Sequence, residues 1–290
     1  MLISMNSILE KAVKEHYAVA AVNVWNGESV QKCFEAASEL RAPIIINVSG
    51  FVKDMEWIAG AARYWERKYP EVPAALSLDH GFNFDMAARM IHYGYTSVMI
   101  DKSSLPFDEN VRLTKEVVKM AHACGVSVEG EVGHVGGFGF CAPDENGDIS
   151  FNYTATTEDE STTPEVAVEY LKQTGVDCLA VAIGTTHGKY THEPKLDFER
   201  LQEIKKVVNV PLVIHGASFS GDENLTKLVQ CGTAKINIFS ELAEEGLNYS
   251  KRYLESDPEA KIFLMEEQGL KGYKEKMMHF MKLFGQANRY

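Results

Sequence analysis

The chain has 290 residues, of which 45% are hydrophobic and 24% charged, and its net charge at pH 7 is −12. This composition is ordinary for a globular protein, and the length permits one large or two medium domains. The acidic balance disfavours general binding of nucleic acid or of anionic membrane surfaces. We find no signal-peptide pattern at the start and no run approaching the ~20 apolar residues of a membrane span, so we expect no membrane association.

The cysteines are scattered along the chain, odd in number and without Cys-x-x-Cys spacing: Cys33, Cys124, Cys141, Cys178 and Cys231. Disulfides belong to oxidising compartments, where cysteines come in even-numbered frameworks. We therefore expect a protein of the reducing cytoplasm in which most thiols act as small core residues.

Short apolar runs alternate with amphipathic segments. The runs predict strands over 18–24, 43–49, 74–80, 97–103, 127–133, 178–184, 210–217 and 234–240. Helical patterns lie between them, as in 109–123, in 165–173 and in 197–208, and the first two stop at a glycine. Strands that alternate with helices over this length predict an α/β fold with a parallel sheet.

Eight strand–helix units are the count that closes a (β/α)₈ TIM barrel. The alternative is an open doubly wound sheet, which usually carries a Gly-x-Gly-x-x-Gly turn after its first strand. Here that turn reads Trp25-Asn26-Gly27-Glu28, so the barrel is favoured. We expect a single TIM-barrel domain over residues 1–290 with further helices at its carboxyl-terminal end. The segment 134–163, after the fifth strand, is predicted to be irregular, and such long loops are usually functional or disordered.

Polar side chains gather at the carboxyl ends of the predicted strands, whereas the strand interiors are mostly Ala, Val, Ile and Leu. In a barrel these ends meet at one rim, where barrel active sites lie. The polar residues are Asn23, Ser49, Asp79, His80, Asp101, Glu129, Glu131, His187, His215, Asn237 and Ser240. Three of the nine histidines and four acids are thus predicted to converge on one end of the barrel.

Three imidazoles from three strand ends predict a transition-metal site. Neutral imidazole suits Zn²⁺, and three protein ligands leave one position open for a substrate. A single histidine could be an ordinary polar loop residue, but His80, His187 and His215 each lie next to a glycine at corresponding strand ends, which favours the metal. The other histidines, His134 among them, are predicted to be surface or structural residues.

Asp79 and His80 are neighbours, so in a regular strand their side chains would leave opposite faces. A sharp turn at Gly81 would let both address one cavity. The loops after the last three predicted strands add glycines and the hydroxyls of Ser218 and Ser240. Such loops often hold phosphate through backbone N–H groups and hydroxyls, although ordinary tight turns are the alternative.

Together these residues resemble the class II, metal-dependent fructose- and tagatose-bisphosphate aldolases. The resemblance runs from Ala18 to about Ser240, and its most specific pieces are SLDH, VMIDKSSLPFDEN, VEGEVG, CLAVAIGTTHGKY, PLVIHGAS and KINIFSE. Several such pieces in the same order are much more specific than any one of them. The fold of that family is a (β/α)₈ barrel, which agrees with the strand count.

The resemblance implies a zinc-dependent carbon–carbon lyase that reversibly cleaves a ketose 1-phosphate or a ketose 1,6-bisphosphate into dihydroxyacetone phosphate and an aldehyde. It implies that His80, His187 and His215 hold one catalytic Zn²⁺. It also implies that Asp79 is the general acid/base for the proton on the C4 hydroxyl. Asp101 and Glu131 match acids near the metal that can bind a second or displaced ion.

For the dihydroxyacetone phosphate half, the resemblance implies a further set of residues: Gly188, Gly216, Ala217, Ser218, Asn237, Ile238, Phe239 and Ser240, with Asn23 and Ser49 beside them. It allows a monovalent cation, Na⁺ or K⁺, near the phosphate. It also implies a homo-oligomer, either a dimer or a tetramer.

The loop after the fifth strand departs from the family pattern. The family usually has two glycines followed by acids, one of which exchanges the C3 proton, but here Gly139 occupies the acidic position and Asp144 and Glu145 lie further on. Phe219 and Phe239 replace a glycine and an aspartate that are common in the family. These changes concern the substrate pocket, so a ketose phosphate without a second phosphate is one candidate substrate.

Two other functions compete with the aldolase. A non-catalytic sugar-phosphate-binding relative would explain the altered loop after the fifth strand. A metal-dependent hydrolase on the same fold would favour a carboxylate-rich site with two metal ions.

Overall fold

The computed structural model describes residues 2–140, 151–154, 161–190 and 192–290. Its main sheet is a closed barrel of eight parallel strands in the order β1-β10-β9-β8-β5-β4-β3-β2. The strands are β1 Val19–Asn23, β2 Ile44–Ser49, β3 Ala74–Asp79, β4 Ser97–Met99, β5 Ser127–Val132, β8 Cys178–Val181, β9 Leu212–Ile214 and β10 Thr233–Ile238. Each overlaps one of the predicted runs, so the predicted (β/α)₈ barrel is confirmed.

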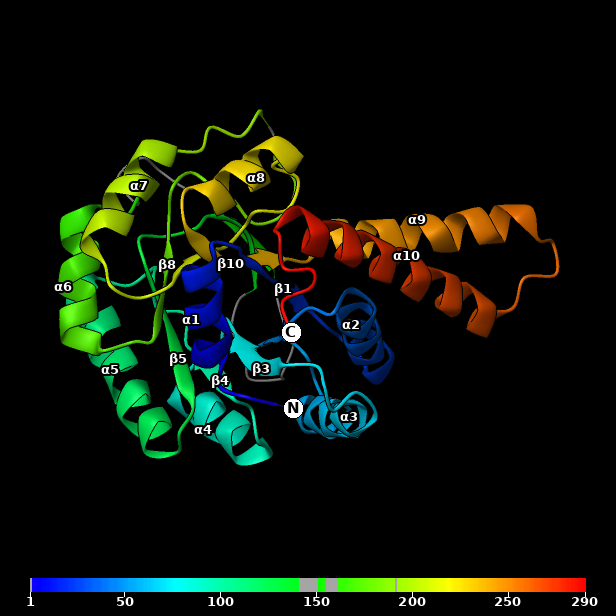
Figure 1. Ribbon diagram of the computed structural model, residues 1–290, viewed down its shortest axis with the longest axis horizontal. Helices are drawn as coiled ribbons and strands as arrows, with labels where there is room; N and C mark the ends of the chain where they lie inside the picture. Colours follow the sequence, from blue (N-terminus) through cyan, green and yellow to red (C-terminus); the bar gives the residue numbers. More distant parts are fainter. Residues whose placement is uncertain (1, 141–150, 155–160, 191) are drawn as a thin grey trace.

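Helices cover the outside of the barrel (Figure 1). They are α2 Gly27–Leu40, α3 Met55–Lys68, α4 Phe84–Tyr93, α5 Phe107–Ala123, α6 Pro164–Thr174, α7 Phe198–Val207 and α8 Asp222–Gln230. Polar residues before five of them accept a hydrogen bond from the first helical turn, which satisfies a backbone N–H that would otherwise lack a partner. These caps are Asn26, Asp54, Asn83, Thr163 and Asp197.

The helix α1 (Met5–Glu15) closes the amino-terminal end of the barrel, and the sequence analysis did not predict it. Its apolar face, which includes Met5, Ile8 and Leu9, packs against inward-facing residues of the strands such as Val19 and Ile45. In Figure 1, α1 lies in front of the barrel strands. The carboxyl ends of the strands, with their polar residues, lie at the opposite end.

Part of the segment predicted to be irregular forms a small antiparallel sheet, so that prediction was wrong for these residues. The sheet consists of β6 (Gly137–Phe140) and β7 (Phe151–Thr154), with Gly137 opposite Thr154. Backbone hydrogen bonds between the two segments form this sheet. The alternation Gly-Phe-Gly-Phe in β6 has the period of two that is typical of a strand. Asp144 and Glu145, the acids that follow Gly139 in the sequence, lie outside the described residues.

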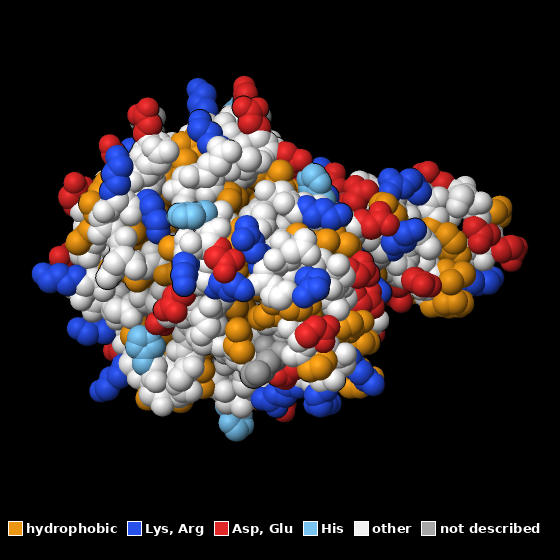
Figure 2. All heavy atoms as spheres, in the orientation of Figure 1, with side chains coloured by type: hydrophobic (Ala, Val, Ile, Leu, Met, Phe, Trp, Pro, Cys, Tyr) orange, Lys and Arg blue, Asp and Glu red, His pale blue; other side chains and the backbone are white. Residues whose placement is uncertain are grey.

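Two long helices, α9 (Ser240–Ser256) and α10 (Ile262–Leu283), follow the last strand and confirm the predicted carboxyl-terminal helices. They run side by side as an arm that projects from the barrel (Figure 1). Glycine permits their close approach, because a Cβ on Gly246 would lie 2.9 Å from the carbonyl oxygen of Gly269. Hydrophobic side chains are exposed along the arm and at its far end (Figure 2), and they are 50–71% exposed: Leu247, Leu254, Ile262 and Phe263.

Within the described part of the chain, none of the helices combines the length and the apolarity that crossing a membrane requires.

Candidate active site

Alternation along the strands sends the polar residues into the barrel. In β3, Leu76 and Leu78 belong to the outer core beneath the helices, whereas Ala75 faces the barrel interior. Since successive side chains leave opposite faces of a strand, Asp79 falls on the inward side. The same parity directs Glu129 and Glu131 of β5 inward, because Val128 and Val132 belong to the outer core.

His80 reaches the same cavity because the backbone turns at its own position. Its φ is +49°, in the left-handed region that residues other than glycine seldom adopt. The turn brings His80 Nε2 to 4.0 Å from Asp79 Oδ1. The expected turn therefore exists, but the residue with the unusual φ is His80 rather than Gly81. Gly81 is needed for another reason, since a Cβ there would lie 2.6 Å from the carbonyl oxygen of Met99.

The three histidines at the ends of β3, β8 and β9 meet at the carboxyl-terminal rim. The ring centroids of His80 and His215 lie 4.7 Å apart, those of His80 and His187 lie 5.1 Å apart, and those of His187 and His215 lie 6.1 Å apart. One nitrogen atom from each ring lies within 4.8 Å of the other two. The structure thus brings together the histidines that the sequence analysis selected, at a spacing that a metal ion can bridge.

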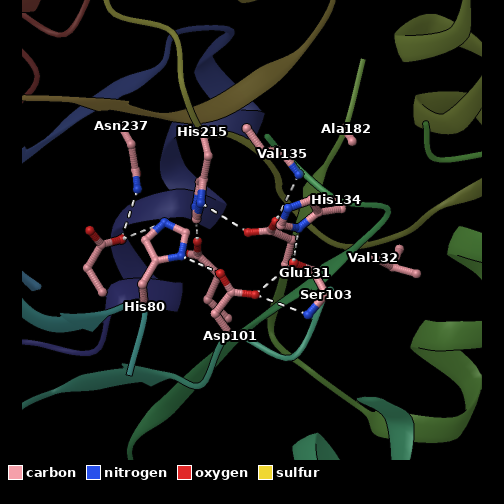
Figure 3. Close-up of polar contacts among 12 residues, drawn as sticks. His80, Asp101, Ser103, Glu131, Val132, His134, Val135, Ala182, His215 and Asn237 are labelled. Carbon is pink, nitrogen blue, oxygen red and sulfur yellow. Dashed lines mark hydrogen bonds and ion pairs between the residues drawn. The ribbon is translucent and has the colours of Figure 1, made fainter. Parts of the chain in front are cut away.

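Carboxylates orient two of these rings (Figure 3). His80 Nδ1 donates to Asp101 Oδ2 at 2.7 Å, and His215 Nε2 donates to Glu129 Oε1 at 2.6 Å. A carboxylate only accepts, so in the neutral rings the other nitrogen atoms, His80 Nε2 and His215 Nδ1, carry the lone pairs. Buried His215 Nδ1 has no hydrogen-bond partner, although Glu131 Oε2 lies 3.2 Å away. Histidine ligands of metals are commonly held by a carboxylate in this manner.

The surrounding acids make the site attractive to a cation. Burial alone would lower the pKa of His80, but the negative charges of Asp79 and Asp101 outweigh it and raise this pKa to about 10. Burial and the neighbouring charges of His80 and His215 lower the pKa of His187 to about 3. The carboxylates thus favour positive charge among the rings, as protons or as a metal ion that replaces them.

A second group of potential ligands shares His80 with the first. Atoms of His80, Asp101 and Glu131 lie within 4.8 Å of one another, and buried Glu131 Oε2 has no hydrogen-bond partner. Asp101 is held from behind, because the backbone N–H and the hydroxyl of Ser103 donate to its Oδ1 at 3.0 and 2.7 Å. His134 Nδ1 lies 3.1 Å from the same hydroxyl, which ties this histidine to the periphery of the site.

Asp79 is held at the centre of a network of donors. Its side chain is 5% exposed and accepts hydrogen bonds from Asn23 Nδ2 at 2.7 Å, Ser49 Oγ at 3.2 Å and Asn237 Nδ2 at 3.0 Å. Burial alone would raise the pKa of Asp79, but the positive charges of His80, His215 and Lys235 outweigh it and lower this pKa to about 2. The sequence analysis assigned Asn23, Ser49 and Asn237 to the substrate, whereas their side chains here donate to Asp79.

The loops after β8, β9 and β10 lie against one another. Gly216 adopts a φ of +64° and approaches Thr186 so closely that a Cβ would lie 2.6 Å from the Thr186 carbonyl carbon. Ser218 Oγ accepts a hydrogen bond from the backbone N–H of Phe239 at 3.3 Å. The structure places the members of the predicted phosphate set on these loops or beside them: Gly188, Gly216, Ala217, Ser218, Phe239 and Ser240. Ile238 differs, because its side chain is buried in the outer core.

The sequence analysis assigned no role to Lys235 or Glu129, yet both lie directly beneath the site. Lys235 is 1% exposed, and its Nζ lies 2.8 Å from Glu129 Oε2 and 2.7 Å from Asn237 Oδ1. The signal in the sequence was the spacing, since Lys235 and Asn237 are two residues apart on one strand and therefore share a face.

Comparisons with known proteins agree with this arrangement. The family model described as "Fructose-bisphosphate aldolase class-II" matches residues 3–289. The fructose-bisphosphate aldolase of Helicobacter pylori strain J99 is 44% identical over 229 residues, which is 77% of this chain and 71% of that protein. The YdjI aldolase from Escherichia coli K12 has a similar structure, with a TM-score of 0.83 and 32% identity over 99% of both chains. A putative fructose-1,6-biphosphate aldolase from Coccidioides immitis gives a TM-score of 0.84 at 28% identity, over 98% of this chain and 96% of that one.

The barrel, its rim and these relatives define an aldolase, a lyase that acts on carbon–carbon bonds. The chain belongs to the class II fructose-bisphosphate aldolase family, so the predicted resemblance is confirmed. The enzymes of this family act on sugar phosphates and are generally metal-dependent.

Proposed function

We propose that the protein is a zinc-dependent aldolase that reversibly cleaves a ketose 1-phosphate or a ketose 1,6-bisphosphate into dihydroxyacetone phosphate and an aldehyde. The observation that supports this most strongly is the meeting of His80, His187 and His215 beside the buried Asp79. A set of three imidazoles suits Zn²⁺.

The donor atoms fit such an ion. His80, His187 and His215 would hold it, and Asp101 and Glu131 would serve a second or displaced ion. Two buried atoms of this group, His215 Nδ1 and Glu131 Oε2, face each other at 3.2 Å and have no other partner, so both are available to a metal ion. A divalent metal supplies Lewis acidity that stabilises the negative charge left on the ketone fragment when the carbon–carbon bond breaks.

Asp79 is our candidate for the proton transfer. In the cleavage direction it takes the proton from the C4 hydroxyl, whose carbon becomes the aldehyde, and in the condensation direction it returns that proton. The donors from Asn23, Ser49 and Asn237 hold the carboxylate ionised and fixed in direction. Asp79 would therefore meet the substrate hydroxyl already in the basic form.

The phosphate of the dihydroxyacetone half would bind among the loops after β8, β9 and β10. Gly188, Gly216, Ala217, Ser218, Phe239 and Ser240 supply backbone N–H groups and hydroxyls there, and Na⁺ or K⁺ would lie beside the phosphate. The helix α9 begins at Ser240, and its amino-terminal end adds a favourable partial charge for an anion.

Of the two substrate classes we favour the ketose 1-phosphates. Lys189 lies two residues after His187, but its Nζ forms an ion pair with Glu244 at 2.8 Å and lies 5.3 Å from the ring centroid of Phe219. Its charge is therefore already balanced within the protein. Phe219 and Phe239 further give this part of the rim an apolar character.

A screen of retro-aldol cleavage over ketose 1-phosphates and 1,6-bisphosphates, with the aldehyde product identified, tests the proposal. Cleavage that stops on chelation and returns with Zn²⁺ would support it. The alternative is a non-catalytic sugar-phosphate-binding relative, which Gly139 in place of an acid favours. Binding of these sugar phosphates without any cleavage by the zinc-loaded protein would support that alternative instead.

We also propose a homo-oligomer, a dimer or a tetramer, and a cytoplasmic location. The arm exposes Leu254, Ile262 and Phe263 at its far end, and large exposed apolar patches usually mark an interface. The cysteines of the described residues, Cys33, Cys124, Cys178 and Cys231, are free thiols, as expected in a reducing compartment. Light scattering on the purified protein measures the oligomeric state, and a monomeric mass would contradict the proposal.

A further inference from the structure

Lys235 is a buried cation inside the barrel that is neither a proposed zinc ligand nor the proposed acid/base. It belongs to β10 and is 1% exposed. Lysine is almost never fully buried unless it is paired, because removing an ammonium group from water is costly. Its two contacts show what the pairing does: Nζ donates to Glu129 Oε2 at 2.8 Å and to Asn237 Oδ1 at 2.7 Å.

Each contact leads to a different half of the candidate site. The other carboxylate oxygen of Glu129 accepts from His215 Nε2 at 2.6 Å. The other end of the Asn237 amide donates to Asp79 Oδ1 at 3.0 Å. One side chain, that of Glu129, connects Lys235 to the candidate metal ligand His215. Another, that of Asn237, connects it to the candidate acid/base Asp79. Figure 3 shows His215 and Asn237 side by side, with both side chains directed toward His80.

The chemistry of the donors fixes the direction of both hydrogen-bond chains. An ammonium group only donates, so the atom of Asn237 that faces it must be the amide oxygen, and the NH₂ group must face Asp79. A carboxylate only accepts, so His215 carries a proton on Nε2, and in the neutral ring its lone pair lies on Nδ1, 3.2 Å from Glu131 Oε2. The orientation of the Asn237 amide therefore depends on a donor-only group at position 235. The same group holds Oε2 of Glu129, so that Oε1 faces His215.

We propose that Lys235 is a positioning residue that fixes the hydrogen-bond direction on both sides of itself: it requires an acceptor atom of residue 129, and it turns the NH₂ group of Asn237 toward Asp79. This inference rests on the proposed function, since it takes His215 as a zinc ligand and Asp79 as the base. Removal of the ammonium group alone would leave the buried carboxylate of Glu129 unpaired, so the tests measure metal affinity separately from stability.

The sharpest test reverses the hydrogen-bond direction. In Glu129→Gln, Lys235 still requires an oxygen, so the glutamine NH₂ group turns to His215 and forces the proton onto Nδ1. We expect the affinity for Zn²⁺ to fall about 10–100-fold, the usual effect of losing an orienting partner. In Glu129→Gln/Lys235→Met the amide is free to turn its oxygen back to His215. The double variant should therefore bind Zn²⁺ at least about tenfold more tightly than Glu129→Gln, which recovers part or all of the expected loss in affinity.

Affinity is measured by titrating the metal-free folded protein with Zn²⁺, and with Co²⁺ to follow the ligand-field absorption. Cys178→Ala is the matched control, because its Sγ lies 3.7 Å from the same oxygen, Glu129 Oε2, but carries no charge. The control should bind Zn²⁺ like the wild type. A double variant that binds no more tightly than Glu129→Gln would overturn the inference, even if its melting temperature recovers, since that pattern is expected of a lysine that only balances charge.

Two further outcomes are decisive. If Glu129→Gln does not fold, Lys235→Met alone decides: a folded variant with about tenfold weaker Zn²⁺ binding supports the inference, and unchanged affinity overturns it. Failure of the proposed function looks different, because the wild type itself would then show no stoichiometric binding of Zn²⁺ or Co²⁺.

Discussion

Gly137 lies against His187 so closely that a Cβ at Gly137 would meet the backbone nitrogen of His187 at 2.5 Å. The backbone N–H of His187 also donates to the carbonyl oxygen of Gly136 at 2.8 Å. The loop after β5 therefore holds one of the three histidines in place, although the two segments are some fifty positions apart in the chain.

Gly137→Ala should displace His187. The φ of Gly137 is +110°, so alanine is strained there in addition to the collision, and we expect a loss of more than about 1 kcal/mol in the free energy of unfolding. Zn²⁺ affinity should fall as well. Gly60→Ala is the control, because a Cβ there meets nothing within 4 Å and glycine within a helix costs about 0.5–1 kcal/mol. Chemical denaturation and metal titration measure both effects, and unaltered Zn²⁺ binding in Gly137→Ala would contradict the assigned contact.

Asp79→Asn should keep the metal and lose the chemistry. An amide of the same shape cannot take the C4 proton, so we expect turnover to fall about 10²–10⁴-fold, the usual contribution of a positioned acid or base. Steady-state kinetics with zinc-loaded protein measure this loss, and a Zn²⁺ titration shows whether the site remains. Asp85→Asn, at an exposed position of α4, is the matched control. Turnover close to that of the wild type would remove Asp79 from the mechanism.

Removal of metal should lower both activity and stability. A ligand present at 100 times its dissociation constant stabilises the native state by about 2.7 kcal/mol, so chelation should lower the melting temperature measurably. His187→Ala should abolish this difference, because the variant retains only two of the three imidazoles. Calorimetric melting with chelator and with Zn²⁺ gives the comparison. An identical melting temperature of the wild type in both conditions would speak against a metal site in the native protein.

The base of the arm should weaken in acid. Lys274 of α10 forms ion pairs with Glu35 and Glu39 of α2. Burial alone would raise the pKa of Glu35, but hydrogen bonds from Lys32 and Gln31 and the charge of Lys274 hold it below its ordinary value of 4.5. Because the folded-state pKa is depressed, the stabilisation is present above pH 4.5 and is lost as the pH falls below it.

Glu35→Gln should remove that part of the pH dependence. The expected size is about 0.2–1 kcal/mol, because the carboxylate is partly exposed and solvent screens the pair. Urea denaturation between pH 3 and pH 7, at values spaced around the ordinary Glu range of about 4.3, measures the effect. A variant whose stability falls below pH 4.5 as steeply as that of the wild type would show that Glu35 is not the titrating group.

The barrel and most of its rim could be predicted from the sequence because both depend on local patterns. Polar residues stand at or just after the end of the apolar runs, and in a closed parallel barrel those ends must meet. The spacing could place Lys235 on the same face as Asn237, but its burial and its pairing with Glu129 could not be predicted, since a single lysine in a strand is usually exposed and Glu129 lies far away in the sequence. The turn at His80 was assigned to Gly81 because glycine is the ordinary choice for a positive φ.

Two further misses concern packing partners. The helix α1 precedes the first predicted strand and was not part of the strand–helix alternation. Its role depends on the contact between its apolar face and the inward-facing residues of several strands, which sequence does not show. The small sheet of β6 and β7 depends on the pairing of two short segments, which the brief alternation in β6 does not predict by itself. Asn23, Ser49 and Asn237 were correctly placed at the rim, but sequence alone could not show that all three donate to Asp79.

Because α1 closes the amino-terminal end of the barrel, only the carboxyl-terminal end, where the candidate catalytic groups lie, is open to substrate. Substrate and both products must therefore pass through the same opening. If the phosphate lies deep among the loops of β8, β9 and β10, the aldehyde lies nearer to solvent and departs first, and in the reverse direction it is the last to arrive.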